Sequence, residues 1–325
     1  MVSIVSKDLM MLQHIILLLQ QHDCAISLRK LSQKLPLPVH EIKQNIKVWQ
    51  SFGVNLFEKE DMVFLLSPVY LIDSEALARK IATPLDYFDS LPSTNDFLLG
   101  RLAELESGQL CIAEHQQSGR GRRGKRWFSP YGAHLYQSMY WRSQHDVQYN
   151  SAVGLVIGIA TAQALHQLGV SGVKVKWPND IYRDGYKLAG ILVESQQAHD
   201  GTCHLVIGLG LNISMPNIRC NIDQPFRDLT DVVQGQHTKT DIAYAMWKAM
   251  MAALTDFEKY GLAPLCAQWN KYDLFYGQKI QLTEGCQTLV GYHRGIDNQG
   301  RLQFEYEDKL KTYDSARVSV RLLSQ

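Results

Sequence analysis

The sequence is most distinctive at Ser118-Gly-Arg-Gly-Arg-Arg-Gly-Lys-Arg-Trp127, where five cations and three glycines fall within ten residues. Like charges at this density repel one another and leave little apolar surface to pack. Glycine lets the backbone approach an anion closely, and arginine presents planar donors that match carboxylate and phosphate oxygens. We call residues 118–127 the strap. It is predicted to be a mobile loop that orders around an anion, with a solvated basic loop as the alternative.

Two common phosphate motifs nearly match the strap and are both rejected. Gly119, Gly121 and Gly124 have the spacing of a dinucleotide-binding turn, but Lys-Arg-Trp-Phe-Ser-Pro follows where that motif needs a helix. Gly119, Gly124 and Lys125 fit most of a P-loop, but Arg126 replaces the hydroxyl residue that would bind magnesium.

Two clusters further along the chain combine cations with turn residues. In Lys174-Val-Lys-Trp-Pro-Asn-Asp180, a β-prone run ends at Trp-Pro and exposes an Asn-Asp pair, which suits a magnesium ion, a cationic partner or a plain turn. Asp184-Gly185 predicts a hairpin turn, after which Lys187 begins a strand whose Gly190 leaves room for a ligand. A lysine there could neutralise charge on a phosphate during transfer, or be an ordinary strand-start lysine.

Two polar clusters suit a small heterocyclic ligand. Ser93-Thr94-Asn95 can donate and accept hydrogen bonds at a helix start, although a plain N-cap explains it too. Gly208-Leu-Gly-Leu-Asn212 alternates glycines in a strand, which makes a flat face for a ligand.

The hydrophobic pattern divides the chain into three domains joined by one linker. Residues 1–66 follow the order of a winged helix-turn-helix, 67–84 are a linker, 85–271 alternate strands and helices as an α/β (α+β) catalytic domain, and 272–325 read as five short strands of a small barrel. The catalytic domain's expected strands are Tyr87–Asp89, Leu110–Glu114, Leu135–Trp141, Val173–Lys176, Leu188–Glu194 and His204–Ile213. Its helices are expected to start at Ser93, near Tyr149 and near Thr240.

The N-terminal region carries a candidate DNA-recognition helix at 39–51. Its outer face offers His40, Lys43, Gln44 and Lys47, which can contact phosphates and base edges. Charge barely favours DNA, since residues 1–70 hold seven Lys and Arg against six Asp and Glu. A three-helix packing module is the alternative.

Bulk composition indicates a cytoplasmic globular protein without a membrane partner. The net charge of +1 announces no polyanionic partner, so any phosphate chemistry must come from local clusters. None of the six cysteines, including Cys220, forms a C-x-x-C pair, and no residues are assigned to bind a metal. No signal peptide or apolar run of membrane-spanning length is found.

These clusters occur together and in this order in one family. The chain resembles the bifunctional biotin protein ligases that are also biotin-operon repressors. The resemblance rests on Ser93-Thr-Asn95, Ala113–Gly124, Trp127-Phe-Ser-Pro130, Lys176–Asp180, Lys187–Glu194, Gly208–Asn212 and Arg294-Gly-Ile-Asp297. It implies a catalytic domain of the class II synthetase-like biotin ligase type, an N-terminal winged helix-turn-helix and a C-terminal SH3-like barrel.

The resemblance also implies a reaction and partners. Biotin and ATP, with Mg²⁺, would form biotinyl-5′-adenylate, and biotin would pass to one lysine of a biotin carboxyl carrier protein. The adenylate-bound protein would be a homodimer that binds operator DNA.

Residue roles follow by motif. The implied biotin contacts are Ser93, Thr94, Asn95, Gln116, Gly119, Arg120, Arg122, Trp127, Lys187, Gly190 and Gly208. The implied adenylate contacts are Arg120, Arg122, Asn179, Asn212, Phe226 and Arg321. Lys187, Arg122 and Asp180 are the expected catalytic residues, with Asp180 orienting the acceptor lysine or the metal.

Two departures and two rivals qualify the resemblance. The hairpin tip Glu58-Lys-Glu-Asp61 is acidic where the family's wing is basic, and phosphate would repel it. Phe226 stands near where the family has a tryptophan over adenine, which leaves less area for stacking. The rivals are a lipoate ligase and a ligand-sensing regulator that has lost catalysis.

Overall fold

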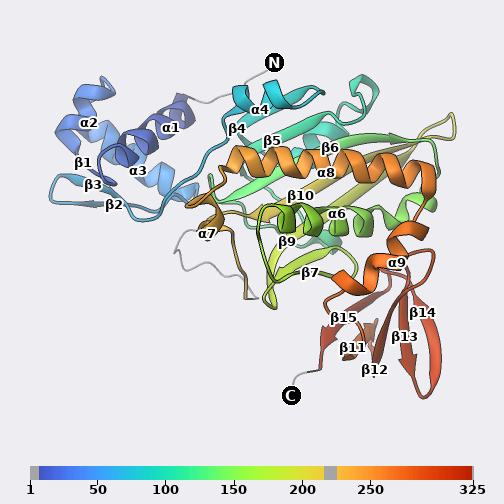
Figure 1. The fold of residues 1–325 in the computed structure, drawn as a ribbon. Helices are drawn as coiled ribbons and strands as arrows, with labels where there is room; N and C mark the ends of the chain where they lie inside the picture. The colour runs from blue at the N-terminus through green and yellow to red at the C-terminus, as the bar shows by residue number, and fades with distance from the viewer. Residues whose placement is uncertain (1–6, 216–224, 324–325) are drawn as a thin grey trace.

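The computed structural model describes residues 7–215 and 225–323. A helical module lies at one end, a large sheet with long helices fills the middle, and a smaller group of strands lies at the C-terminal end (Figure 1). Five of the six cysteines are described, and each is a free thiol: Cys24, Cys111, Cys203, Cys266 and Cys286. Cys220 lies outside the described residues.

The N-terminal module consists of three helices and a three-stranded antiparallel sheet. The helices are α1 (Lys7–Gln20), α2 (Leu28–Lys34) and α3 (Val39–Ser51), and the strands are β1 (Ala25–Ser27), β2 (Leu56–Lys59) and β3 (Met62–Leu65) in the order β1-β3-β2. Ser27 caps α2, accepting from the Lys30 amide at 3.2 Å. The apolar stripe of α3, Ile42, Ile46 and Trp49, is buried.

The hairpin turn is tighter than its sequence suggests. A four-residue connection, Glu58 to Asp61, was expected, but β2 runs through Lys59 and only Glu60 and Asp61 form the turn. Both turn residues have positive φ, 51° and 61°, as two-residue hairpin turns require.

The second half of the expected linker, residues 67–84, is helical and packs against the main core. Helix α4 (Ser74–Lys80) lies within it, and Leu77 is fully buried in the main core. The Glu114 carboxylate accepts from the Ile72 amide at 2.8 Å and from Lys239 Nζ at 2.5 Å, with both charged side chains fully buried. A buried carboxylate with these partners ties the segment to the catalytic domain. The period of so short a helix is hard to detect in the sequence.

The catalytic domain is built on a seven-stranded sheet. Its strands are β4 (Leu85–Leu91), β5 (Leu110–Gln116), β6 (His134–Ser143), β7 (Val173–Lys176), β8 (Asp180–Arg183), β9 (Tyr186–Gln197) and β10 (Cys203–Asn212). Their order is β4-β5-β6-β10-β9-β8-β7, with only β4 and β5 parallel among the pairs described. The six expected strands are all present, and β8 is the strand that the sequence pattern missed. Asp184 and Gly185 form the predicted hairpin turn, with φ of 52° and 82°.

Helices cover the two faces of this sheet differently. The main core lies between the sheet and α6 (Val153–Gln167), α8 (Lys239–Tyr260) and α9 (Ala263–Tyr272), of which α8 is the long helix across Figure 1. Short α5 (Thr94–Leu99) covers part of the other face through a separate small core. The remaining short helices are η1 (Leu102–Glu104), η2 (Arg122–Gly124), η3 (Tyr149–Ala152) and α7 (Thr230–Val233). Much of the face beside α5 is therefore left for the strap.

The C-terminal region forms a five-stranded antiparallel sheet. Its strands are β11 (Lys279–Glu284), β12 (Gln287–Ile296), β13 (Leu302–Tyr306), β14 (Lys309–Tyr313) and β15 (Val318–Leu322), in the order β14-β13-β12-β11-β15. A buried polar group joins it to α9, where Trp269 Nε1 donates to Asp273 at 2.5 Å and His293 Nε2 lies 3.3 Å from the same carboxylate oxygen. Burial raises the pKa of Asp273 to about 6 and lowers that of His293 to about 4.

The N-terminal module contacts the catalytic domain just beyond the strap. The Tyr131 amide donates to the Phe52 carbonyl at 2.8 Å, and the Phe52 and His115 rings lie edge to face. Gly53, with φ of 84°, approaches Pro130 so closely that a β-carbon would lie 2.6 Å from it. None of the helices in the described ranges is both long and apolar enough to cross a bilayer.

Candidate active site

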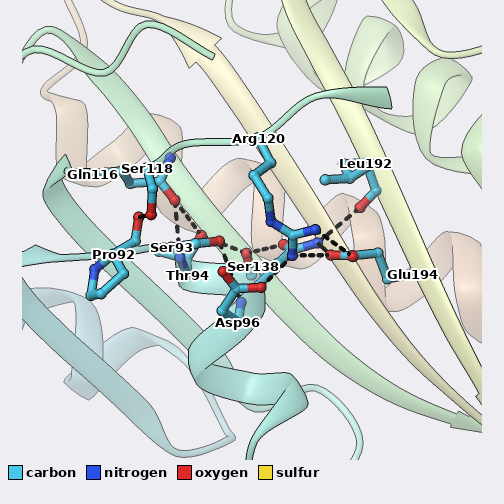
Figure 2. Close-up of polar contacts among 11 residues, drawn as sticks. Pro92, Ser93, Thr94, Asp96, Gln116, Ser118, Arg120, Ser138, Leu192 and Glu194 are labelled. Carbon is cyan, nitrogen blue, oxygen red and sulfur yellow. Dashed lines mark hydrogen bonds and ion pairs between the residues drawn. The ribbon is translucent and has the colours of Figure 1, made fainter. Parts of the chain in front are cut away.

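The Ser93-Thr94-Asn95 cluster lies at the start of α5, against the sheet face opposite α6. Ser93 caps α5. The side-chain oxygen Oε1 of Gln116 accepts from the backbone amide and from the hydroxyl of Thr94, at 2.9 and 3.2 Å. Ser138 on β6 lies within hydrogen-bond distance of Thr94 Oγ1 and Asn95 Oδ1, at 2.7 and 2.6 Å (Figure 2). The N-cap interpretation of Ser93 is confirmed, and its contact with a ligand stays a prediction.

The strap closes on itself and lies over the same face. The Trp127 amide donates to the Gly119 carbonyl at 2.8 Å, and the Gly121 amide donates to the Lys125 carbonyl at 2.7 Å. The expected mobile loop is thus a hydrogen-bonded loop before any anion is considered. Arg123 at its tip has φ of 56°, uncommon for a residue with a side chain.

Trp127 lies flat against the glycines of β9 and β10. A β-carbon on Gly190 would lie 3.1 Å from its ring, and one on Gly210 only 2.7 Å away. The ring also lies beneath Lys187, whose Nζ is 5.4 Å from the ring centroid. Its buried Nε1 finds no hydrogen-bond partner among the described residues. The predicted flat face exists, but a protein side chain already uses part of it.

Gly208 serves a neighbouring part of the predicted pocket. A β-carbon there would lie 2.4 Å from Asn95 Oδ1, so glycine is needed for α5 to approach β10. The glycine at 208 therefore places Asn95. Gly119 is similarly crowded, since a β-carbon would lie 2.5 Å from Ser129 Oγ.

Lys187 and Asp180 form a close ion pair on this face. Lys187 Nζ lies 2.8 Å from Asp180 Oδ1, and their side chains are only 16% and 22% exposed. Asp180 was expected to orient an acceptor lysine or a metal, yet its partner in the structure is Lys187. Burial lowers the pKa of neighbouring Lys176, and the cations Lys187, Arg321 and Lys125 lower it further while Asp180 raises it. Arg321 thus lies near enough to Lys176 to affect its pKa, and its implied contact with the adenylate stays a prediction.

Three of the four strap arginines, Arg120, Arg122 and Arg123, have three different sets of side-chain partners. Arg120 pairs with Asp96 and Glu194. Arg122 donates to Asn179 Oδ1 at 3.3 Å and to the Ser315 carbonyl at 3.1 Å. Burial and the adjacent Arg123 lower the pKa of Arg122.

Arg123 joins the strap to the C-terminal sheet. It donates to the carbonyls of Ser315, Ala316 and Val318, at 3.2, 3.1 and 3.0 Å. Beside Arg122, a cavity of about 140 Å³ opens between the N-terminal end of α6, residues 177–179 and the C-terminal sheet. The strap is therefore held by two domains.

Of the expected adenylate residues other than the arginines, Asn212 and Phe226 contact the backbone of Lys187, whereas Asn179 contacts the backbone of β9 further along. Asn212 Nδ2 donates to the carbonyls of Arg227 and Lys187, at 2.8 and 3.4 Å. Phe226 forms a backbone bridge to Lys187 and is 38% exposed. Asn179 Nδ2 donates to the Ile191 carbonyl at 2.6 Å. Asn212 and Asn179 thus hold backbone around Lys187 and the glycine strand.

Sequence reasoning missed several residues of this face. Asp96 and Glu194 hold Arg120, Ser138 bridges the α5 cluster, and His134 lies between the rings of Trp127 and Tyr136. Glu194 ends the Lys187–Glu194 motif, and Asp96 directly follows Ser93-Thr94-Asn95. Their positions in the sequence therefore gave a weak indication that both belong to this face. His134 had no such indication, because only its pairing with Asn212 across β6 and β10 brings it here.

No protein-held metal centre fits these residues. Across residues 7–215 and 225–323, no three His, Cys, Asp or Glu side chains converge on a point that could hold an ion. Magnesium keeps several waters and often binds through substrate phosphates. We therefore derive no step through a protein-bound ion.

The candidate DNA-contacting residues of α3 are divided by the hairpin. His40, Gln44 and Lys47 are exposed. Lys43 instead lies 2.7 Å from Glu58 and 3.4 Å from Asp61 of the hairpin. The acidic tip noted in the sequence thus neutralises one expected contact.

Comparison with known proteins agrees with this geometry. Residues 87–212 match the model of the Biotin/lipoate A/B protein ligase family. The chain is 36% identical over 295 residues to the Bifunctional ligase/repressor BirA of Escherichia coli, covering 90% of this chain and 92% of that protein. It is 31% identical over 225 residues to the Biotin--[acetyl-CoA-carboxylase] ligase of Mycobacterium tuberculosis, covering 67% of this chain and 82% of the relative.

Solved structures agree on the fold. The biotin protein ligase of Aquifex aeolicus in complex with biotin and ATP aligns with a TM-score of 0.64 at 23% identity, covering 74% of this chain and 99% of that one. The sequence relationship carries more weight, because it extends over nearly the whole of both proteins. On that basis, this chain belongs to the biotin protein ligase family, together with the bifunctional ligase/repressors.

Proposed function

We propose that this protein is an ATP-dependent biotin protein ligase. It joins biotin to AMP as biotinyl-5′-adenylate and then transfers biotin to a lysine of a biotin carboxyl carrier protein. The observation that carries the proposal is the convergence of Lys187, Arg120 and Trp127 of the strap, and the Thr94–Gln116 pair on one sheet face. The similarity to named ligases over nearly the whole chain supports the same activity.

In the first step, the biotin carboxylate oxygen bonds to the α-phosphorus of ATP, and the bond to pyrophosphate breaks. Two anions must approach each other, so fixed cations lower the barrier most where charge accumulates. Lys187 is held by Asp180 at 2.8 Å over the glycine strand, and Arg122 is held by Asn179 beside it. Both guanidinium and ammonium groups are thus preorganised before substrate binds.

In the second step, the acceptor lysine's amine bonds to the biotinyl carbonyl carbon, AMP leaves, and the amine loses a proton. The mixed anhydride must be shielded from water until then. The strap supplies this cover, since it is pinned to the catalytic domain by Arg120 and to the C-terminal sheet by Arg123.

Biotin itself is bound at its ureido end by Ser93, Thr94 and Gln116, with Asn95 in support. The ureido group offers two donors and one acceptor, and this cluster presents hydroxyl and amide groups of both kinds. A lipoate-type ligand lacks that group and would make fewer hydrogen bonds with this cluster. This favours biotin over the lipoate rival.

The direct test is to mix the protein with biotin, ATP–magnesium and an apo carrier domain. We expect a mass gain on the carrier that depends on biotin and ATP. Competition between biotin and lipoate in a pyrophosphate-exchange assay should favour biotin. A protein that binds biotin but never releases AMP would instead be the non-catalytic sensor, and the ligase proposal would fail.

We also propose that the N-terminal module is a winged helix-turn-helix that binds operator DNA, that adenylate promotes homodimerisation, and that the C-terminal sheet is an SH3-like barrel. The ligase/repressor relatives and the helix-and-hairpin order support the DNA role. Sedimentation with and without adenylate tests the dimer. A gel shift with the chain's own biotin-gene promoter tests DNA binding, and its absence with adenylate present would refute repression.

A further inference from the structure

Arg120 is the strap arginine whose charge the fold neutralises most completely. Its guanidinium donates to both Glu194 carboxylate oxygens, at 2.9 and 3.0 Å, and to Asp96 on α5 (Figure 2). Two carboxylates therefore face one cation. Although burial acts in the opposite direction, Glu194 and Asp96 raise the pKa of Arg120.

This pairing changes what Arg120 can do. A guanidinium that is already paired with two carboxylates contributes little net attraction for another anion. The motif implied that Arg120 holds the carboxylate and phosphate. Its partners instead make it a fastening for the strap, which leaves Arg122 as the strap arginine nearest to Asn179 and the cationic cluster.

The ion pair continues into the polar cluster at the start of α5. Asn95 Nδ2 donates to Glu194 Oε2 at 2.8 Å, while Asn95 Oδ1 accepts from Ser138. Asn95 is only 4% exposed, so its amide is fixed at both ends. Glu194 thus links the strap to the polar cluster that includes Thr94.

The Arg120–Glu194 pair is held by more contacts than an ordinary surface ion pair. Exposed pairs contribute little because two flexible chains must be held in one conformation. Here the Arg120–Glu194 contact is bidentate, and Glu194 also accepts from a buried amide. The carboxylate is therefore held before Arg120 arrives.

We propose that Glu194, assisted by Asp96, is a positioning residue for the ligase reaction. We call Arg120, Asp96 and Glu194 the arginine anchor: it holds the strap closed over the adenylate and fixes Asn95 beside the ureido site. The inference rests on the proposed ligase function and adds the residues that govern adenylate retention.

The test is the rate at which preformed adenylate leaves the full-length protein without carrier. The variants are Glu194→Gln, Asp96→Asn, Arg120→Gln and the Arg120→Gln/Glu194→Gln double variant. Asp200→Asn is the matched control, because Asp200 also pairs with an exposed arginine, Arg142, but at the β9–β10 hairpin. Melting temperatures identify any variant that fails to fold. If Glu194→Gln does not fold, Asp96→Asn still tests the proposal, because Asp96 is more exposed.

We expect Glu194→Gln to release adenylate about tenfold faster at low salt, as the loss of a bidentate charged contact implies. Asp96→Asn should have a smaller effect, and Asp200→Asn none. The double variant should release no faster than Arg120→Gln alone, because both changes break one interaction. Salt at about 1 M should accelerate release from the wild type more than from Glu194→Gln, since it screens the exposed pair.

Wild-type retention in Glu194→Gln and Asp96→Asn, or strictly additive effects in the double variant, would overturn the anchor. The two proposals fail in different ways. If the wild type forms no adenylate at all, the ligase proposal fails and the anchor with it. If the wild type forms and retains adenylate but folded Glu194→Gln does so equally well, only the anchor fails.

Discussion

The strap and the outer face of α3 both present cations, but the fold treats them differently. In the strap, arginine partners come from other elements: carboxylates for Arg120, and carbonyls of the C-terminal sheet for Arg123. On α3, the adjacent hairpin pairs with Lys43 and leaves Lys47 exposed. Cation density alone therefore does not identify the group that binds an anion; its tertiary partners do.

Replacing Lys187 should produce the largest effect, because it is the cation proposed to act on the reacting phosphate. We expect Lys187→Met to lower the rate of adenylate formation by about 100- to 1,000-fold, as loss of one preorganised electrostatic contact does elsewhere. Pyrophosphate exchange measures this step. Lys311→Met, an exposed lysine on β14, is the control. Near-normal exchange in the Lys187 variant would mean that the sheet face does not hold the reaction.

Arg122 is the strap residue whose loss should open the cover. We expect Arg122→Gly to release adenylate roughly 100-fold faster, since several charge-assisted contacts are lost together. Bystander lysines should then become biotinylated, which mass spectrometry of an added inert protein measures. Arg123→Gly is the informative comparison, because it removes the Arg123 contacts with residues 315–318 while leaving Arg122 and its own contacts with Asn179 and Ser315 in place. Unchanged retention in the Arg122 variant would contradict the covering role.

Much of the fold was predictable from the sequence. The pairing of side chains was not, for an identifiable reason. Local periodicity gave the six expected strands and the long helix, and turn chemistry gave Asp184-Gly185. The family motifs also put Lys187 and Asp180 in one expected catalytic set, but not as partners of each other. Pairing depends on strand register and helix docking, which a local pattern does not specify. For the same reason Glu194 was read only as the end of a motif.

The floor beneath the strap should respond to pH through His134. Burial and nearby Lys239 lower the pKa of His134 in the folded protein from 6.5 to about 3. Its stabilising contribution is then present above pH 6.5 and lost as pH falls toward 3, because only the unfolded chain takes up the proton. At about pH 5.5 the loss amounts to roughly 1 kcal/mol.

Urea unfolding of the wild type and His134→Asn at about pH 7.5 and pH 5.5 isolates this contribution, because other buried histidines titrate alike in both proteins. The wild type should lose roughly 1 kcal/mol more of its unfolding free energy than the variant between the two pH values. If the difference in unfolding free energy between the wild type and His134→Asn does not change with pH, His134 is not held neutral beneath Trp127.

The hairpin of the N-terminal module should restrain DNA binding by holding Lys43. We expect the double change Glu58→Gln and Asp61→Asn to raise affinity for promoter DNA about fivefold, since it removes repulsion and frees a cation for phosphate. Fluorescence anisotropy at two salt concentrations measures the affinity and its salt dependence. Glu75→Gln on α4 is the control for loss of an acidic charge elsewhere.

The cause of that gain can be separated from simple loss of repulsion. Adding Lys43→Ala to the hairpin double variant should abolish most of the gain and make the salt dependence shallower by about one unit, as loss of one phosphate contact predicts. If the triple variant keeps the full gain, the acidic turn acts only through repulsion and Lys43 makes no contact. If neither variant differs from the wild type, α3 does not approach DNA with this face. Of the two cationic surfaces, only the strap would then bind an anion.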